Sequence, residues 1–332
     1  MVNAIAALET TQLWGDGSAS SSDGQRFLFP RRVLQRTYSH QLGDFALEFY
    51  TFIANNYAPF YTVPIECTER DAPYVLDGLL YHESDLDPEE HYTDTHGYVE
   101  LNFAAFPMFG KRFCPRIRGL HRQWIYRIDP HKDYGPLTAI VSRKKRTIHL
   151  DWITAYWDQM GQFFASFAAG HTTASVALKR LLACGPRNHF YRAVRELGRV
   201  YKTLFILDYL RDPHLRRRVR RGLLKGEQLH ALARHVHYGK QGQADARDLR
   251  QQMSTASCLV LILAAIVYWQ ITEIDRVLRT WDPHEEGLDP ALLAHISPIG
   301  WDNVLLYGEY RLDRTHVRPP RSGVQDHTQE TW

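Results

Sequence analysis

The order in which strand and helix patterns alternate along the first 120 residues constrains the fold of this chain most strongly. Three β-prone runs come first, and Gly, Asn and Pro turn signals separate them. The runs are Ser18–Phe29, Ala46–Ala54 and Phe60–Cys67. Strands that follow one another with only turns between them pair most simply as an antiparallel meander. We therefore expect the chain to begin with an antiparallel sheet.

Helix and strand patterns alternate after this meander. Helical spacing over Ala72–His82, with Asp71 as a plausible N-cap, precedes a short strand at Glu90–Thr95. A helix near Val99–Phe109 and a strand over Arg112–Ile117 complete the order β-β-β-α-β-α-β. This order predicts an α/β fold with a ribonuclease H-like core, in which helices cover a mixed five-stranded sheet.

The remainder of the chain shows only helical signals from Trp152 to about His237, with Thr172 and Asn188 as predicted N-caps. Asp212-Pro213 opens another helix. Four parts are predicted: a first core part with both aspartates (1–150), a helical basic insertion (151–222), the glutamate helix with C-terminal helices (223–310) and a polar, disordered tail (311–332).

Charge is distributed unevenly along the chain. Residues 1–110 carry 5 basic and 16 acidic side chains, whereas residues 111–230 carry 25 basic and 8 acidic ones. A carboxylate-rich segment followed by a basic segment is typical of proteins that act on nucleic acid, although two faces that merely attract each other are the alternative. The predicted DNA-contacting residues are Arg216, Arg217, Arg218, Arg220, Arg221 and Lys225. The alternative for each arginine is a solvated helix face.

Other site chemistries have weaker support. The four cysteines form no C-x-x-C pair, which argues against a zinc ribbon or a disulfide framework and favours a reducing, cytoplasmic location. His230, His235 and His237 form no i,i+4 pair, so structural or phosphate-facing histidines are favoured over zinc ligands.

The apolar run Cys258–Trp269 has 12 residues, fewer than the roughly 18–20 that span a bilayer. It therefore predicts a buried helix and no membrane partner.

Three carboxylates are the strongest candidate site. Asp23 lies on the first predicted strand and Asp94 at the end of the fourth, and these strands are neighbours in such a sheet. Glu227 lies on a later helix. Because Mg²⁺ prefers hard oxygen ligands, the three acids predict a Mg²⁺ site in which Mn²⁺ can substitute. Taken singly, Asp23 could be a turn residue, Asp94 a helix N-cap and Glu227 an exposed first-turn charge. Nearby Asp16 and Asp77 are predicted to be structural or supporting residues.

Seven ordered stretches carry a family resemblance. They are WGDGSASSSDGQRF (Trp14–Phe27), APYVLDGLLYHESDL (Ala72–Leu86), EEHYTDTHGY (Glu89–Tyr98), PRIRGL (Pro115–Leu120), RELGRVYKTLFIL (Arg195–Leu207), LKGEQLHALAR (Leu224–Arg234) and LLAHISPIGWDNVLLYGEY (Leu292–Tyr310). Together they resemble the C-terminal catalytic domain of Tn3-type transposases. The resemblance runs from about Leu13 to Tyr310.

The resemblance implies a DDE-type ribonuclease H-like domain with a helical insertion before the glutamate. It places the catalytic, metal-holding acids at Asp23 in SSDGQ, Asp94 in YTDT and Glu227 in KGE. The implied reaction is cleavage of phosphodiesters at transposon ends and strand transfer into target DNA, in replicative transposition by a homodimeric assembly. Two Mg²⁺ ions are implied, with Asp23 bridging both.

The sequence departs from the family pattern in three places. The family's long N-terminal region, which recognises terminal inverted repeats, does not precede Met1, so we expect a truncated transposase. Leu224 stands where Asn usually precedes Lys-Gly-Glu, and Gln270 where Asn usually follows Trp. A catalytically inactive DNA-binding fragment and a helical interaction module are the alternatives, and the presence of all three acids favours the enzyme. Trp301, Tyr307 and Tyr310 are predicted to pack in a core rather than stack on DNA bases.

Overall fold

The computed structural model describes residues 1–29, 36–95, 97–142, 146–237, 248–280 and 290–305. Residues 1–301 form one compact unit. The predicted polar tail at 311–332 lies outside the described residues, as do Tyr307 and Tyr310. The other core candidate, Trp301, is partly buried against the hydrophobic core, as predicted.

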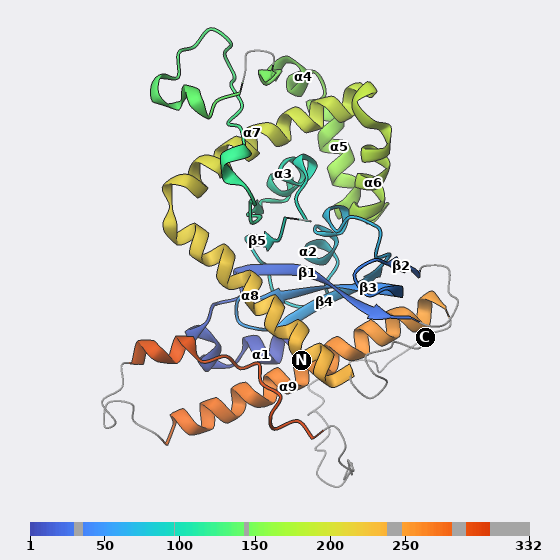
Figure 1. The fold of residues 1–332 in the computed structure, drawn as a ribbon, viewed down its shortest axis with the longest axis vertical. Coiled ribbons are helices and arrows are strands. Elements are labelled where there is room, and N and C mark those ends of the chain that lie inside the picture. Colours follow the sequence, from blue (N-terminus) through green and yellow to red (C-terminus); the bar gives the residue numbers. More distant parts are fainter. Residues whose placement is uncertain (30–35, 96, 143–145, 238–247, 281–289, 306–332) are drawn as a thin grey trace, which may run out of the picture. The chain divides into compact units, whose positions relative to one another are not determined.

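One mixed sheet lies at the centre of this unit (Figure 1). Its strands are β1 (Ala19–Leu28), β2 (Thr37–Ser39), β3 (Asp44–Ala54), β4 (Pro59–Ile65), β5 (Glu90–Thr93) and β6 (Arg112–Phe113). The order is β2-β3-β1-β5-β6, and β4 also pairs with β3. The strands β5 and β6 run parallel to β1, and the other pairs are antiparallel. The predicted α/β class with a mixed sheet is confirmed.

The sheet has one strand more than the five predicted, but it is no wider. One edge of β3 pairs with β1, and its other edge pairs with β2 over Asp44–Ala46 and with β4 over Glu48–Ile53. The short β2 and the longer β4 therefore occupy successive parts of the same edge. Five strand positions across the sheet result, with β1 in the middle.

Helices dominate the chain after β6. The α-helices are α1 (Val2–Ala6), α2 (Asp77–Leu80), α3 (Glu100–Ala105), α4 (Leu150–Ala155), α5 (Trp157–Ala168), α6 (Ala174–Cys184), α7 (His189–Arg211), α8 (Pro213–Val236) and α9 (Leu249–Leu278). Short 3-10 turns cover Glu9–Leu13, Ala72–Tyr74, Phe106–Phe109, Leu120–Arg122, Gly135–Ala139, Gly185–Arg187 and Pro290–His295. The helical character predicted for residues 152–237 is confirmed.

Local capping follows the sequence signals at two helices and differs at a third. Asn188 accepts a hydrogen bond from Tyr191 N at the start of α7, and Asp212 accepts one from His214 N at the start of α8. The prediction that Thr172 caps α6 was wrong by one residue, because the Thr173 hydroxyl accepts the bond from Val176 N. Adjacent threonines offer the same capping group, so only the backbone conformation distinguishes them.

The helix predicted over Ala72–His82 is broken into the 3-10 turn Ala72–Tyr74 and the single turn α2. Asp71 occupies the N-cap position of the 3-10 turn, as predicted, but its side chain makes no capping hydrogen bond there. Asp77, at the start of α2, is buried and accepts a hydrogen bond from Ser175 N of α6. This long-range bond agrees with the structural role predicted for Asp77.

The long helix α8 packs closely on β1 and on its neighbour β5 (Figure 1). A Cβ at Gly222 would overlap the ring of Tyr92 on β5, whereas a Cβ at Gly226 would make an ordinary contact with the Ser21 hydroxyl. Ser21 Oγ donates to the Gly222 carbonyl at 2.8 Å, and Gln25 Nε2 donates to the His230 carbonyl at 2.9 Å. Two turns of α8 are therefore fixed along β1.

The helix α9 contains the apolar run predicted as a buried helix, but only one of its faces is buried. Leu263, Val267 and Ile271 are buried, whereas Leu261 and Trp269 are 57% and 45% exposed. In length and composition α9 is the one helix of the described ranges that could cross a membrane, a criterion that core helices of folded domains also meet. Gln270, one of the departures from the family pattern, donates to the Gly300 carbonyl at 2.8 Å.

Gly198 provides a test of the packing between α7 and α3. A Cβ at this position would overlap the carbonyl oxygen of Glu100, and backbone cannot move aside as a flexible side chain can. We expect Gly198→Ala to lower the free energy of unfolding by roughly 1–3 kcal/mol, the usual penalty for overpacking. Urea denaturation measures the effect. In the matched control Gly161→Ala, nothing lies within 4 Å of the new Cβ. Because alanine favours a helix more than glycine does, the free energy of unfolding should stay the same or rise by up to about 1 kcal/mol. Equal stabilities of the two variants would contradict this packing.

Candidate active site

The parallel pairing of β1 with β5 brings Asp23 and Asp94 together. The last register pair of these strands is Ser22 with Thr93, and Asp23 and Asp94 are the next residues along each strand. Asp94 Oδ1 accepts a hydrogen bond from Gly97 N at 3.2 Å, and α3 begins only at Glu100, so Asp94 is not its N-cap. The neighbouring-strand arrangement predicted from the sequence is therefore present.

Alternation along β1 directs Asp23 toward α8. Ser21 and Gln25 both hydrogen-bond to α8. Because every second side chain of a strand points to the same face, Asp23 between them points to the α8 side as well. Ser20 and Ser22 point the other way, where each hydroxyl contacts a ring nitrogen of buried His91 at 2.8 Å. The turn alternative for Asp23 was wrong, because this residue lies within a continuous ten-residue strand.

The helix α8 carries Glu227 and His230 to the same side. Glu227 lies in the middle of α8 and is exposed, so the first-turn alternative for this residue was wrong. His230 Nδ1 lies 3.7 Å from Asp23 Oδ2. Burial lowers the pKa of His230 to about 4, with a smaller contribution from the Arg234 charge, so the imidazole is neutral near pH 7. A neutral ring beside Asp23 agrees with a structural role better than with a charged phosphate contact.

The electrostatics of Asp23 reflect the approach of the three acids. Burial and, after it, the charges of Asp94, Glu48 and Glu227 raise the pKa of Asp23 to about 7, against the opposing hydrogen bond from the Gly24 N–H at 2.9 Å. The side chain remains one-third exposed. Asp94 and Glu227 therefore act on the same carboxyl group from a strand end and a helix.

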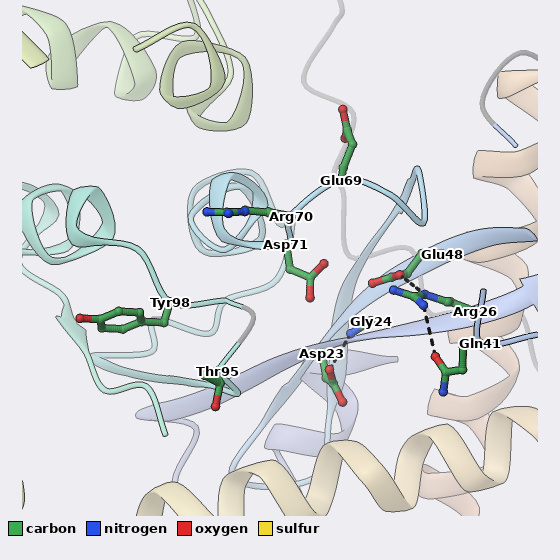
Figure 2. Close-up of a pocket in the computed structure, with 10 residues that line it drawn as sticks. All are labelled: Asp23, Gly24, Arg26, Gln41, Glu48, Glu69, Arg70, Asp71, Thr95 and Tyr98. Atoms are coloured by element: carbon green, nitrogen blue, oxygen red, sulfur yellow. Dashed lines mark hydrogen bonds and ion pairs between the residues drawn. The ribbon is translucent and has the colours of Figure 1, made fainter. Parts of the chain in front are cut away.

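A cavity of about 400 Å³ opens beside Asp23 (Figure 2). Its lining residues are Asp23, Gly24, Arg26, Gln41, Glu48, Glu69, Arg70, Asp71, Thr95 and Tyr98. In Figure 2 the carboxyl group of Asp71 points toward the strand that carries Asp23, whereas the carboxyl group of Asp23 points toward the helix on the other side of that strand. Gly24 is needed at its position, because a Cβ there would overlap the Glu48 carboxylate.

Two of the residues that line this cavity were not assigned to the site from the sequence. Glu48 was not singled out at all, and Asp71 was considered only as a helix cap. Burial raises the pKa of Asp71 to about 8, and the charge of Glu48 and a hydrogen bond to it are the next causes. Glu48 is buried and forms an ion pair with Arg26, with 2.8 Å between Nε and Oε2. The signal for Glu48 was present in the sequence, since it is a single charge within the apolar strand run ALEFYTFIA.

The donor chemistry of Asp23, Asp94 and Glu227 suits a hard divalent cation. All three offer carboxylate oxygens, the ligands that Mg²⁺ prefers, and cation binding would relieve the repulsion that raises the pKa of Asp23. Within the described ranges, no three Asp, Glu, His or Cys side chains are already placed to share one ion. The metal ligands therefore stay a prediction.

The predicted DNA-contacting residues divide into two groups. Arg217, Arg220 and Arg221 are exposed on α8, as is Leu224, the other departure from the family pattern. Arg216 donates to the carbonyls of Tyr209 and Leu210 at the end of α7, and Arg218 pairs with Glu90 at 3.4 Å. The exposed group has the accessibility that phosphate contacts require.

Lys225 differs from these arginines. Its ammonium group donates to the backbone carbonyls of Trp14 and Asn55 and lies 4.5 Å from the centre of the Tyr57 ring. Burial lowers the pKa of Lys225 to about 8. These contacts attach α8 to the segment before β1 and to the turn between β3 and β4. The phosphate-contacting role of Lys225 stays a prediction, as do those of the arginines.

Asp71 generates a pH-dependent prediction for the metal-free protein. An acid whose folded pKa is about 8 holds its proton in the folded state between pH 3.8 and 8, so its contribution to the free energy of unfolding decreases as pH rises through this window. Asp71→Asn mimics the protonated acid and should gain on the order of 1–3 kcal/mol relative to wild type from about pH 5 to about pH 8.

Urea denaturation at several pH values measures this difference in stability. Comparison with wild type cancels the opposite contribution of buried His91 and His230, whose pKa values are lowered to about 3 and about 4. Asp151→Asn, at an exposed aspartate, is the matched control and should show no such trend. A pH-independent difference between Asp71→Asn and wild type would contradict the raised pKa.

Comparisons with known proteins identify the family to which this chain belongs. A family model described as the Tn3 transposase DDE domain matches residues 1–310. The transposase for transposon Tn2501 of Escherichia coli is 40% identical over 315 residues, which cover 93% of this chain and 31% of that protein. The transposase for transposon Tn501 of Pseudomonas aeruginosa is 40% identical over 319 residues, or 93% and 32% of the two chains.

A third relative, the transposase for transposon Tn1546 of Enterococcus faecium, is 36% identical over 322 residues, which cover 96% of this chain and 32% of that protein. The chain thus spans about a third of the length of these relatives. The family predicted from seven ordered sequence stretches is confirmed. This chain belongs to the Tn3 transposase DDE domain family.

Proposed function

We propose that this chain is a DNA transposase catalytic domain that cleaves phosphodiesters at transposon ends and transfers the freed strands into target DNA. One observation carries the proposal: Asp23 and Asp94 are register neighbours on parallel strands, and Glu227 approaches Asp23 closely enough to raise its pKa. Family membership supports DNA cleavage in general. The catalytic residues are Asp23, Asp94 and Glu227, which also hold the metal.

The acids perform this function by their placement on different elements. Asp23 comes from the central strand, Asp94 from the end of its parallel neighbour and Glu227 from the helix packed on both. Mg²⁺, or Mn²⁺ in its place, would stabilise charge on the scissile phosphate and lower the pKa of the attacking hydroxyl when bound. Asp23 is the group whose ionisation responds to that binding, because its pKa of about 7 lies near physiological pH.

Positive charge on α8 supplies the binding surface in this proposal. Arg217, Arg220 and Arg221 lie one to three turns before Glu227 on the same helix, so a DNA backbone that contacts them passes close to the acids. Transposon ends and target DNA are the proposed partners, with a homodimer as the active assembly in the cytoplasm. A DNA-binding fragment without catalysis is the alternative that the next experiment distinguishes.

Removal of Asp94 should abolish cleavage. In a nicking assay on supercoiled DNA with Mg²⁺ or Mn²⁺, we expect Asp94→Ala to reduce the rate by on the order of 100-fold or more, because a catalytic metal loses a ligand. The matched control Asp151→Ala, at a residue whose side chain is 73% exposed, should nick at the wild-type rate. Equal nicking by Asp94→Ala and wild type would refute the assignment of Asp94, and no nicking by wild type would favour the inactive fragment.

The exposed arginines of α8 should set the salt dependence of DNA binding. Each phosphate contact contributes about 0.9 to the slope of log affinity against log salt, so Arg217→Ala with Arg221→Ala should reduce the slope by about two. Gel-shift titrations over a range of salt concentrations measure it. Arg180→Ala with Arg187→Ala, two exposed arginines on and after α6, is the control and should retain the slope. An unchanged slope in the α8 variant would remove these arginines from the DNA contact.

A further inference from the structure

The segment after β6 continues beside β5 as far as the candidate active site. Three hydrogen bonds with regular two-residue spacing show this: Arg112 N donates to Glu89 O at 2.7 Å, Cys114 N to His91 O at 2.8 Å and Arg116 N to Thr93 O at 2.8 Å. The register of β5 with β6 pairs Glu90 with Arg112 and His91 with Phe113. Continuation of that register places Arg116 opposite Asp94.

Three neighbouring strands therefore carry Asp23, Asp94 and Arg116 in one row across the sheet. Residues in register on adjacent strands direct their side chains to the same face. The equivalent row four residues earlier confirms that such side chains meet here, because Arg112 forms an ion pair with Glu90 at 3.2 Å. The row puts Arg116 opposite Asp94, so its side chain leaves the sheet on the same face as that of the second catalytic aspartate.

Arg116 and Arg118 differ from the other arginines near this face. Both are exposed, and no carboxylate among the described residues forms an ion pair with either. Ile117 between them is partly buried against both hydrophobic clusters, so the extended backbone directs the two arginines to the opposite, solvent side. By contrast, Arg112 pairs with Glu90 and Asp208, and Arg218 pairs with Glu90.

We propose that Arg116, assisted by Arg118, binds the DNA phosphates next to the scissile phosphate and thereby positions the scissile strand over Asp94. This inference rests on the proposed function and adds two positioning residues to it. Guanidinium suits the task because its planar donors bind a phosphate bidentately and remain charged at every physiological pH. The α8 arginines would hold the duplex further from the reacting atoms.

The two roles predict different kinetics. Loss of a remote phosphate contact weakens binding, and saturating protein restores the nicking rate. Loss of a contact beside the reacting phosphate also lowers the rate at saturation, because misplacement of the reacting group by about 1 Å can reduce rates by about 100-fold. At saturating protein with Mg²⁺ and supercoiled plasmid, we expect Arg116→Ala to nick 10- to 100-fold more slowly than wild type. Arg180→Ala with Arg187→Ala, two exposed arginines outside the proposed DNA contact, should nick at the wild-type rate.

Conservative replacement and chemical rescue separate a phosphate contact from a structural role. Arg116→Lys keeps the charge and should retain a larger part of the rate than Arg116→Ala. Added guanidinium ion should accelerate Arg116→Ala and leave Arg180→Ala unchanged. Thermal unfolding of each variant establishes that the fold is intact, as expected for an exposed side chain. A wild-type rate for Arg116→Ala at saturation would overturn the positioning role.

DNA affinity, measured under conditions without cleavage, tests the phosphate contact independently of catalysis. With Ca²⁺ and a short DNA duplex, Arg116→Ala with Arg118→Ala should reduce the slope of log affinity against log salt by about two, and Arg180→Ala with Arg187→Ala should not. An unchanged slope would overturn the phosphate contact. A reduced slope together with a wild-type protein that never nicks DNA would refute the proposed function and the positioning role, while supporting the phosphate contact.

Discussion

The close packing of α8 on β1 is the contact on which the candidate site depends. Glu227 follows Asp23 by about two hundred residues, and only a helix that lies directly against the central strand can bring the two acids together. Gly222 lacks a side chain that would overlap the ring of Tyr92, and Ser21 and Gln25 fix the position of the helix by hydrogen bonds to its backbone. Small residues between strand and helix thus convert a sequence-distant pair of carboxylates into neighbours.

Burial of neighbouring carboxyl groups creates electrostatic strain in the folded chain. Burial and neighbouring charges raise the pKa of Asp23 to about 7 and of Asp71 to about 8, so each acid favours its protonated form more than in the unfolded chain. A structural site would pair such acids with cations, as Arg26 is paired with Glu48. Partly unpaired carboxylates beside an open cavity are instead the arrangement of a site that binds a cationic ligand.

Sequence patterns predicted the parts of this site that depend on strand order. Asp23 and Asp94 follow from the β-β-β-α-β-α-β order, because parallel neighbours share one sheet edge. Glu48 and Asp71 could not be assigned in this way. A lone charge in an apolar strand does not reveal what it contacts, and an aspartate before Ala-Pro has the same local pattern whether it caps a helix or lines a cavity. Packing between segments that are distant in the sequence decides whether such a residue caps a helix or lines a cavity, and a short stretch of sequence does not reveal that packing.

The uneven charge along the sequence had two explanations, and the structure indicates that each applies to different residues. Ion pairs join the basic segment to the acidic one at Lys111–Asp87, Arg112–Glu90, Lys179–Glu69, Arg199–Glu100 and Arg218–Glu90. Attraction between the two segments therefore accounts for a large part of the asymmetry. Arg217, Arg220 and Arg221 of α8 and Arg116 and Arg118 after β6 form no ion pair with a described carboxylate. Because isolated exposed arginines add little to folding stability, their exposure agrees with the phosphate contacts proposed for them.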